Sequence, residues 1–137
     1  MTVSEFFLQE RLGLLMEYVL TSAEMKASDK AAIETYGIHS LVLMERAALQ
    51  TVKVIIDRFG AEAYVGVIAG AGNNGGDGIA IARILQEQGI RAEINMIGDL
   101  SKLSEETAVQ LEIAKKLNIP IYYGVEHTTY DVLVDAI

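Results

Sequence analysis

The residues with the clearest capacity for chemistry lie in one short segment, residues 70–78, which reads Gly-Ala-Gly-Asn-Asn-Gly-Gly-Asp-Gly. Glycine loses more backbone entropy on folding than any other residue, so five glycines in nine positions require a structural reason. Left-handed conformations at glycine and asparagine would turn successive N–H groups toward one concave spot that holds an anion. A plain strand-to-helix turn, the alternative, needs only about one or two glycines. The segment therefore predicts a phosphate-binding loop, to which the positive end of a following helix adds its attraction.

Polar side chains lie within this segment and at one position far from it. Asn73 and Asn74 bring amide oxygens, which can ligate a hard cation or accept hydrogen bonds from a ligand. Asp77 is placed to cap a helix that begins at Gly78, and it can also contact the ligand directly; both roles can hold together. Asp135 ends an apolar run that is typical of a buried strand. These four polar residues are therefore the candidate site residues.

A Gly-x-Gly-x-x-Gly pattern at Gly70, Gly72 and Gly75 raises the alternative of an ordinary NAD-dependent oxidoreductase. That class also requires an acidic residue about 20 positions later, at the end of the second strand. Glu93 has this spacing but lies near the start of that strand, and Asp99 lies at its correct end but late. The pattern alone gives this alternative little support.

The elements that must position these residues follow from hydrophobic runs and helix boundary signals. The expected helices cover residues 21–36, 40–58 with Ser40 as the cap, 79–88 and 104–116. The expected strands cover residues 64–69, 91–97, 119–123 and 131–136. Alternation of strands and helices predicts a parallel sheet, whose ligands bind beyond the carboxyl ends of the strands. Both the glycine segment and Asp135 fall at such ends.

Bulk properties favour a single acidic domain. A chain of 137 residues with a net charge of −8 repels nucleic acid, although a local loop can still hold a nucleotide phosphate. Without cysteine, and with two histidines, disulfides are excluded and zinc is disfavoured; the composition fits a reducing cytosol. No apolar run reaches the roughly 20 residues of a membrane span. Residues 1–20 are expected to form a leader or short amphipathic helix, and residues 21–137 the domain.

Three motifs, in order, resemble the YjeF N-terminal domain family, whose members are NAD(P)H-hydrate epimerases. The glycine segment follows a valine-rich strand and precedes Ile-Ala-Ile-Ala-Arg, as in that family. Upstream, the family's two N-terminal helices are similar to residues 24–29, 36–38 and 41–48. Near the end, residues 130–137 (Tyr-Asp-Val-Leu-Val-Asp-Ala-Ile) are similar to the family's strand that carries an acidic site residue. The resemblance spans residues 19–137.

The resemblance implies a three-layer α/β/α Rossmann-like sandwich with a mostly parallel sheet. It implies interconversion of the R and S forms of hydrated NADH or NADPH at nicotinamide C6, in cofactor repair. It implies a potassium ion ligated by Asn74 and Asp135. The residues implied to hold the hydrated dinucleotide are Asn73, Asn74, Gly75, Gly76 and Asp77.

The family also implies partners. Its members are often fused to, or work beside, an ADP- or ATP-dependent NAD(P)H-hydrate dehydratase, and they commonly form homodimers in the cytoplasm. No nucleic acid and no membrane is expected among the partners. The family pattern continues past residue 137 with another glycine loop, so the domain is expected to be incomplete and to lack part of the pocket. A non-catalytic nucleotide-binding or scaffold module on the same fold is the alternative function.

Epimerisation itself sets a chemical requirement. The hydroxyl group must leave and return, or the ring must open and close, and either route moves protons. Asp135, at a strand's carboxyl end opposite the glycine segment, is the candidate acid/base residue. Its alternative role is that of a cation ligand, because a carboxylate bound to a cation is a poor base.

Overall fold

The computed structural model describes residues 21–125 and 129–137. The prediction of a leader or short helix over residues 1–20 lies outside the described residues. The described elements are, in chain order, α2 (Ser22–Glu34), α3 (Ser40–Phe59), β1 (Val65–Ala69), α4 (Asn73–Glu87), β2 (Ala92–Met96), the short 3₁₀ helix η1 (Leu100–Lys102), α5 (Glu105–Lys116), β3 (Ile121–Tyr123) and β4 (Val132–Ala136).

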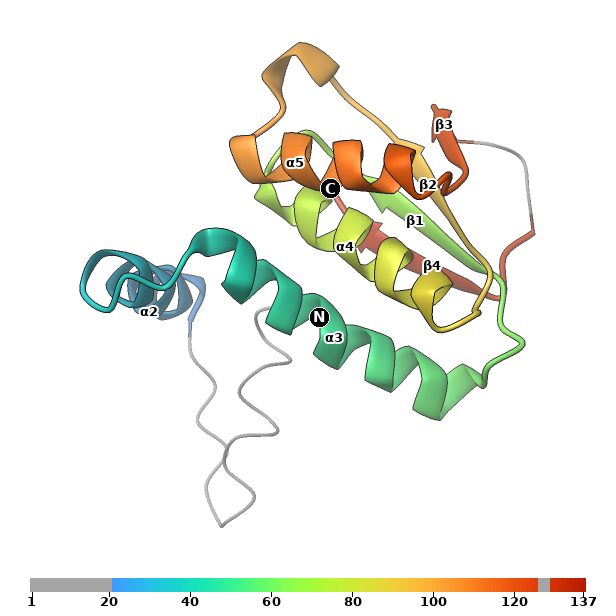
Figure 1. Cartoon of the computed structure of the whole chain (residues 1–137), viewed down its shortest axis with the longest axis horizontal. Coiled ribbons are helices and arrows are strands. Elements are labelled where there is room, and N and C mark those ends of the chain that lie inside the picture. The colour runs from blue at the N-terminus through green and yellow to red at the C-terminus, as the bar shows by residue number, and fades with distance from the viewer. Residues whose placement is uncertain (1–20, 126–128) are drawn as a thin grey trace.

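The four described strands form one parallel sheet in the order β3-β2-β1-β4 (Figure 1). At its centre, Val67 of β1 is in register with Ile94 of β2 and with Val134 of β4. Helix α4 connects β1 to β2, and α5 connects β2 to β3. The predicted alternation and the parallel sheet are thereby confirmed, and both Asn73 and Asp135 lie at the carboxyl edge of the sheet.

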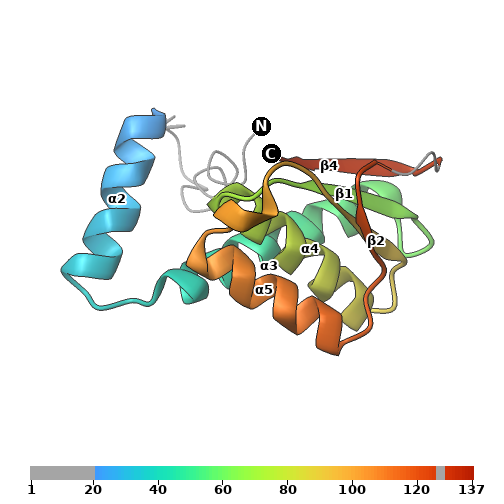
Figure 2. The same cartoon turned by 90° about the horizontal axis from the view of Figure 1, so that it is seen from above.

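Helices α3, α4 and α5 form a layer on one face of the sheet, with α4 between the other two (Figure 2). Residues 78–85 of α4 are all buried and supply much of the core. Helix α2 stands apart, beyond the carboxyl ends of the strands (Figure 2). The expected α/β fold is therefore present, and the described residues supply two layers of the three-layer sandwich.

The start of α4 differs from the sequence-based expectation. The helix begins at Asn73, so residues 73–78 form its first turns and are not a loop. Among the described glycines, those with positive φ are Gly37, Gly60, Gly89, Gly98 and Gly124, all outside residues 70–78. The expected left-handed anion nest is therefore wrong, and so is the prediction that Asp77 caps a helix starting at Gly78.

The glycines of α4 allow the helix to pack closely against its neighbours. A Cβ atom at Gly75 would overlap the backbone carbonyl of Gly70, which cannot move aside as a side chain could. A Cβ atom at Gly78 would lie 2.5 Å from the Cβ of Ala136 and 2.9 Å from Val67. Because these contacts are with β1, with Gly70 directly after it and with the end of β4, the glycines set how closely the start of α4 approaches the sheet.

Helix α3 begins at Ser40, as expected, but its cap is the preceding residue. The Nδ1 atom of His39 accepts a hydrogen bond of 3.2 Å from the backbone N–H of Leu41. Ser40 is already in the helix, so the prediction of Ser40 as the cap is wrong by one position. Histidine does not belong to the usual capping residues, which is why the sequence favoured the serine.

We expect Gly75→Ala to lower the free energy of unfolding by about 1–3 kcal/mol or more, because overpacking against backbone cannot be relieved by a rotamer change. Urea denaturation measures this. Gly72→Ser is the matched control: a Cβ there meets nothing within 4 Å, and the backbone is extended (φ −79°, ψ −178°), which suits a serine cap. Equal destabilisation by the two substitutions would contradict the packing role.

Candidate functional site

The N-terminus of α4 presents backbone N–H groups at the carboxyl edge of the sheet. Its cap residue is Gly72, and no side chain caps it. By contrast, side chains of Thr21, His39 and Ser104 cap α2, α3 and α5. The first amides of a helix have no acceptor within the helix, and they carry its positive end. The first turn of α4 can therefore receive an anion such as a phosphate, without the left-handed nest that the sequence predicted.

Two residues at the start of α5, its cap Ser104 and Thr107, hold the segment that leads into this helix. The hydroxyl group of Thr107 donates a hydrogen bond of 2.8 Å to the carbonyl of Gly72, and the backbone N–H of Ser104 donates one of 2.9 Å to Ala71. Thr107 is fully buried, and its hydroxyl group also accepts from that of Ser104. Sequence reasoning missed these two residues, because a serine and a threonine three positions apart indicate only a helix cap.

Asn74 and Asp135 lie at the same end of the sheet and are linked through the backbone of Ile137. The side-chain nitrogen of Asn74 donates a hydrogen bond of 2.9 Å to the carbonyl of Ile137. The N–H of the same residue donates one of 3.2 Å to Oδ1 of Asp135. The carboxylate of Asp135 is exposed, in register with Ile68 of β1. The structure thus brings these two candidate residues to the same residue, Ile137, whose two backbone groups they bind.

The chemistry of these groups suits a hard cation. Asn74 uses its amide nitrogen for the bond to Ile137, which leaves its Oδ1 atom as an acceptor at the same end of the sheet as the Asp135 carboxylate. Within residues 21–125 and 129–137, no three His, Cys, Asp or Glu side chains come together to hold a metal ion. A cation at this edge would therefore be held by the Asp135 carboxylate together with amide and backbone oxygens, a ligand set that suits a weakly held monovalent ion.

Asp77 lies in the second turn of α4, on the same side of the helix as Asn73, four residues earlier. Its side chain is partly buried. Burial, together with the negative charge of Asp29 on α2, raises the pKa of Asp77 to about 7. Burial also raises the pKa of Asp29. Asp77 is thus a carboxyl group that changes charge near neutral pH.

The two acids considered for a dehydrogenase are occupied elsewhere. Glu93 pairs with Gly66 in the amino-terminal half of β2, and its carboxylate accepts from the Tyr130 hydroxyl group at 3.4 Å and faces Arg91 at 3.5 Å. Asp99 accepts hydrogen bonds from the backbone and side chain of Ser101. Glu93 lies away from the carboxyl edge of the sheet, and Asp99 is engaged within its own turn, so the oxidoreductase alternative gains no support.

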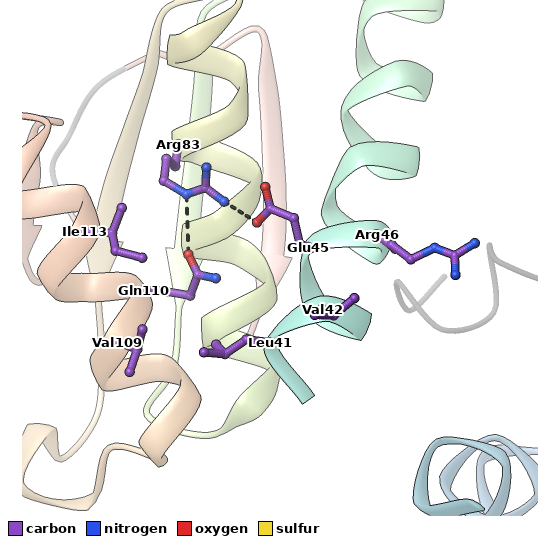
Figure 3. Close-up of a pocket in the computed structure, with 8 residues that line it drawn as sticks. All are labelled: Leu41, Val42, Glu45, Arg46, Arg83, Val109, Gln110 and Ile113. Carbon is purple, nitrogen blue, oxygen red and sulfur yellow. Dashed lines mark hydrogen bonds and ion pairs between the residues drawn. The ribbon is translucent and has the colours of Figure 1, made fainter. Parts of the chain in front are cut away.

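A groove of about 440 Å³ lies on the outer side of the helical layer, between α3, α4 and α5 (Figure 3). Its polar centre is Arg83, which is paired with Glu45 and Glu87 and bonded to Gln110 at 3.4 Å. The remaining lining residues are Leu41, Val42, Arg46, Val109 and Ile113. Because two carboxylates neutralise the guanidinium group, the groove offers a phosphate less than the start of α4 does.

The parallel sheet and the helix N-terminus at its carboxyl edge define an α/β protein of the Rossmann-like class. The family described as YjeF-related protein N-terminus matches residues 40–137, and the chain belongs to this family. The crystal structure of the yeast protein ynu0 has the same fold, with a TM-score of 0.71 and 24% sequence identity over 86% of this chain and 56% of that one.

Curated relatives of this chain carry the name NAD(P)H-hydrate epimerase. The protein from Weissella koreensis is 42% identical over 123 residues, which cover 89% of this chain and 56% of that protein. A protein from Limosilactobacillus reuteri is 47% identical over 107 residues, which cover 77% of this chain and 50% of that protein. The chain therefore spans about half the length of the curated relatives that it matches. None of the described helices is long and apolar enough to cross a membrane.

We expect Asp77→Asn to raise the melting temperature at pH 8 and to give no such gain at pH 4. The pKa of Asp77 is about 7 in the folded state and about 4 in the unfolded state. The folded protein therefore loses stability as the pH rises from about 4 to about 7, because the unfolded chain releases the proton more readily. The asparagine variant avoids that cost. Thermal denaturation at both pH values measures the difference, with the exposed Asp57→Asn on α3 as the control. A difference that is the same at both pH values would contradict the assigned pKa.

Proposed function

We propose that the protein carrying this chain is an NAD(P)H-hydrate epimerase, which interconverts the R and S forms of hydrated NADH and NADPH. The observation that carries the proposal is the open N-terminus of α4 beside Asn74, in a chain 42% identical over 123 residues to a protein of that name. The relatives are about twice as long, so we place the remaining pocket residues outside this sequence. Residues 21–137 form the part that binds the dinucleotide.

The described residues can play different parts in binding the dinucleotide. The pyrophosphate of the dinucleotide would lie against the first two amides of α4, those of Asn73 and Asn74. The amides of Gly75 and Gly76 already donate to the carbonyl of Gly72, at 2.9 and 3.4 Å, so these two residues would contribute close packing next to the ligand. Asn73 is exposed on the first turn, where its amide group can reach the ligand. Asp77 lies on the same side of the helix as Asn73. Thr107 and Ser104 keep the preceding segment in place, so the amides are already oriented before the ligand arrives.

Asn74 and Asp135 would hold a potassium ion through their side-chain oxygens, next to the carbonyl of Ile137. When bound, such an ion supplies positive charge that stabilises the phosphate groups and orders the end of β4. The sequence left Asp135 as either an acid/base residue or a cation ligand. The exposed carboxylate, already bonded to the Ile137 N–H, favours the ligand role.

The same proposal covers partners and location. The product, a mixture of both epimers, suits an ADP- or ATP-dependent NAD(P)H-hydrate dehydratase that uses only one of them, fused or separate, in the cytoplasm. A homodimer would cover the outer side of α3, where Val42, Leu49 and Phe59 are each about half exposed (49%, 45% and 53%). This side of α3 borders the groove of Figure 3.

The activity can be tested on a mixture of R and S hydrated NADPH with an S-specific dehydratase and ATP. After the S form is consumed, adding the full-length protein should restore NADPH production, measured by absorbance, from the remaining R form. Binding of hydrated NADPH by calorimetry without any acceleration would instead support the non-catalytic binding module.

Potassium binding predicts a stability effect that does not depend on activity. A ligand that binds only the folded state raises its stability, so replacing tetramethylammonium by potassium at constant ionic strength should raise the melting temperature. We expect Asp135→Asn to lose most of this rise, because it removes a charged ligand. Asp57→Asn should retain it. An equal rise in all three proteins would show that potassium acts elsewhere.

A further inference from the structure

The side chain of Thr107 belongs to a chain of hydrogen bonds that ends at the peptide group before Asn73. The Ser104 hydroxyl group donates to that of Thr107 at 2.8 Å, and the Thr107 hydroxyl group donates to the carbonyl of Gly72, also at 2.8 Å. The same carbonyl accepts two N–H groups from the first turn of α4, at 2.9 and 3.4 Å. Three donors from two helices therefore fix the direction of this one carbonyl group.

The direction of that carbonyl decides where the N–H of Asn73 points. The peptide group between Gly72 and Asn73 is trans, so its N–H and its carbonyl point in opposite directions. A carbonyl held toward α5 and the body of α4 directs the N–H out of the helix N-terminus. In the part of the chain that the structure describes, no group accepts this N–H. Because hydrogen bonds in a chain polarise one another, the donation from Thr107 also makes the N–H a stronger donor.

The hydroxyl group of Thr107 lies in a dry place, where α3, α4 and α5 meet. A Cβ atom at Gly76 would lie 2.8 Å from this hydroxyl oxygen and 2.7 Å from the side chain of Met44. Thr107 is 0% exposed, so water does not substitute for its hydroxyl group. Without that group, the carbonyl of Gly72 still keeps its two bonds from the helix amides and is not left unsatisfied. Removing the hydroxyl group should therefore affect the peptide group more than the fold.

We propose that Thr107 is a positioning residue for the phosphate groups of the hydrated dinucleotide, and that it acts through the peptide group between Gly72 and Asn73. The inference rests on the epimerase function proposed above, in which the first amides of α4 hold the pyrophosphate. Thr107 does not touch the ligand. Its hydroxyl group sets the direction and the donor strength of the N–H that does.

This role concerns affinity and not the chemical step. The ribose separates the phosphate groups from nicotinamide C6, where the reaction takes place. A contact to the phosphate groups is therefore equally strong in the ground state and in the transition state. Losing such a contact raises KM and leaves kcat unchanged. A residue that only supports the fold has the opposite signature, because a smaller folded fraction lowers the apparent kcat and leaves KM as it was.

The experiment compares the full-length wild type with Thr107→Val, which keeps the branched shape of the side chain but has no hydroxyl group. It measures kcat and KM for hydrated NADPH, and the Kd of the same compound by calorimetry. We expect KM and Kd to rise about 3–10-fold and kcat to stay within about two-fold, as the loss of one ordinary hydrogen bond implies. Thr107→Ser, which retains the hydroxyl group, should restore KM and Kd to nearly the wild-type values.

Thr51→Val on α3 is the matched control. The hydroxyl group of Thr51 also donates to a backbone carbonyl, that of Ala47 at 3.2 Å, but this bond lies within one helix. The control should keep the KM and Kd of the wild type. A rise in KM that is equal in Thr51→Val and Thr107→Val would refute the positioning role. So would a Thr107→Val variant that loses kcat at an unchanged KM, or a Thr107→Ser variant that binds as weakly as the valine variant.

Failure of the proposed function gives a different result from failure of this inference. A wild type that binds hydrated NADPH without accelerating epimerisation refutes the activity, and the comparison of Kd values still tests Thr107. A wild type that neither binds nor accelerates refutes both. If Thr107→Val does not fold, as judged by its thermal transition, Thr107→Ala is compared with Thr107→Ser, since both lack the methyl group. A lower Kd for the serine variant then supports the positioning role, and equal values refute it.

Discussion

The close approach of α4 to β1 and to the end of β4 is the constraint on which the rest of this structure depends. Where the helix packs against Gly70, Val67 and Ala136, there is no space for a Cβ atom at Gly75 or Gly78. This contact brings the first turn of α4 directly to the carboxyl edge of the sheet. Because of it, Asn74 can reach the carbonyl of Ile137, and the helix amides open at the same edge as Asp135.

The same constraint explains why part of the structure could be predicted and part could not. The strands and their parallel order follow from apolar runs that alternate with helices, and these predictions were confirmed. A run of glycines can serve either unusual backbone conformations or close packing against a neighbouring element, and the composition does not distinguish between these two uses. In the structure, residues 73–78 are helical, which moved the helix start by about two turns and removed the capping role of Asp77.

Other parts of the site depend on contacts between distant residues, which a sequence pattern does not display. The sequence predicts Thr107 only as a residue in the first turn of a helix. In the structure its hydroxyl group donates a hydrogen bond to the carbonyl of Gly72, 35 residues away. The sequence predicts Asp29 only as a charged residue on the solvent-exposed side of a helix. In the structure its negative charge contributes to the raised pKa of Asp77. By contrast, Asn74 and Asp135 were predictable as neighbours, since both occupy carboxyl ends of adjacent parts of a parallel sheet.

The bond between Asn74 and Ile137 joins residues 63 positions apart, and β1 pairs with β4 over a similar separation. Such contacts form only after a long stretch of chain has been closed, which makes them slow relative to local helices. During synthesis, α3, β1 and α4 leave the ribosome well before β4 does. The carboxyl edge therefore acquires Asp135 and the carbonyl of Ile137 later than the N-terminus of α4, and a nascent chain that lacks β4 has the helix N-terminus but no partner for Asn74.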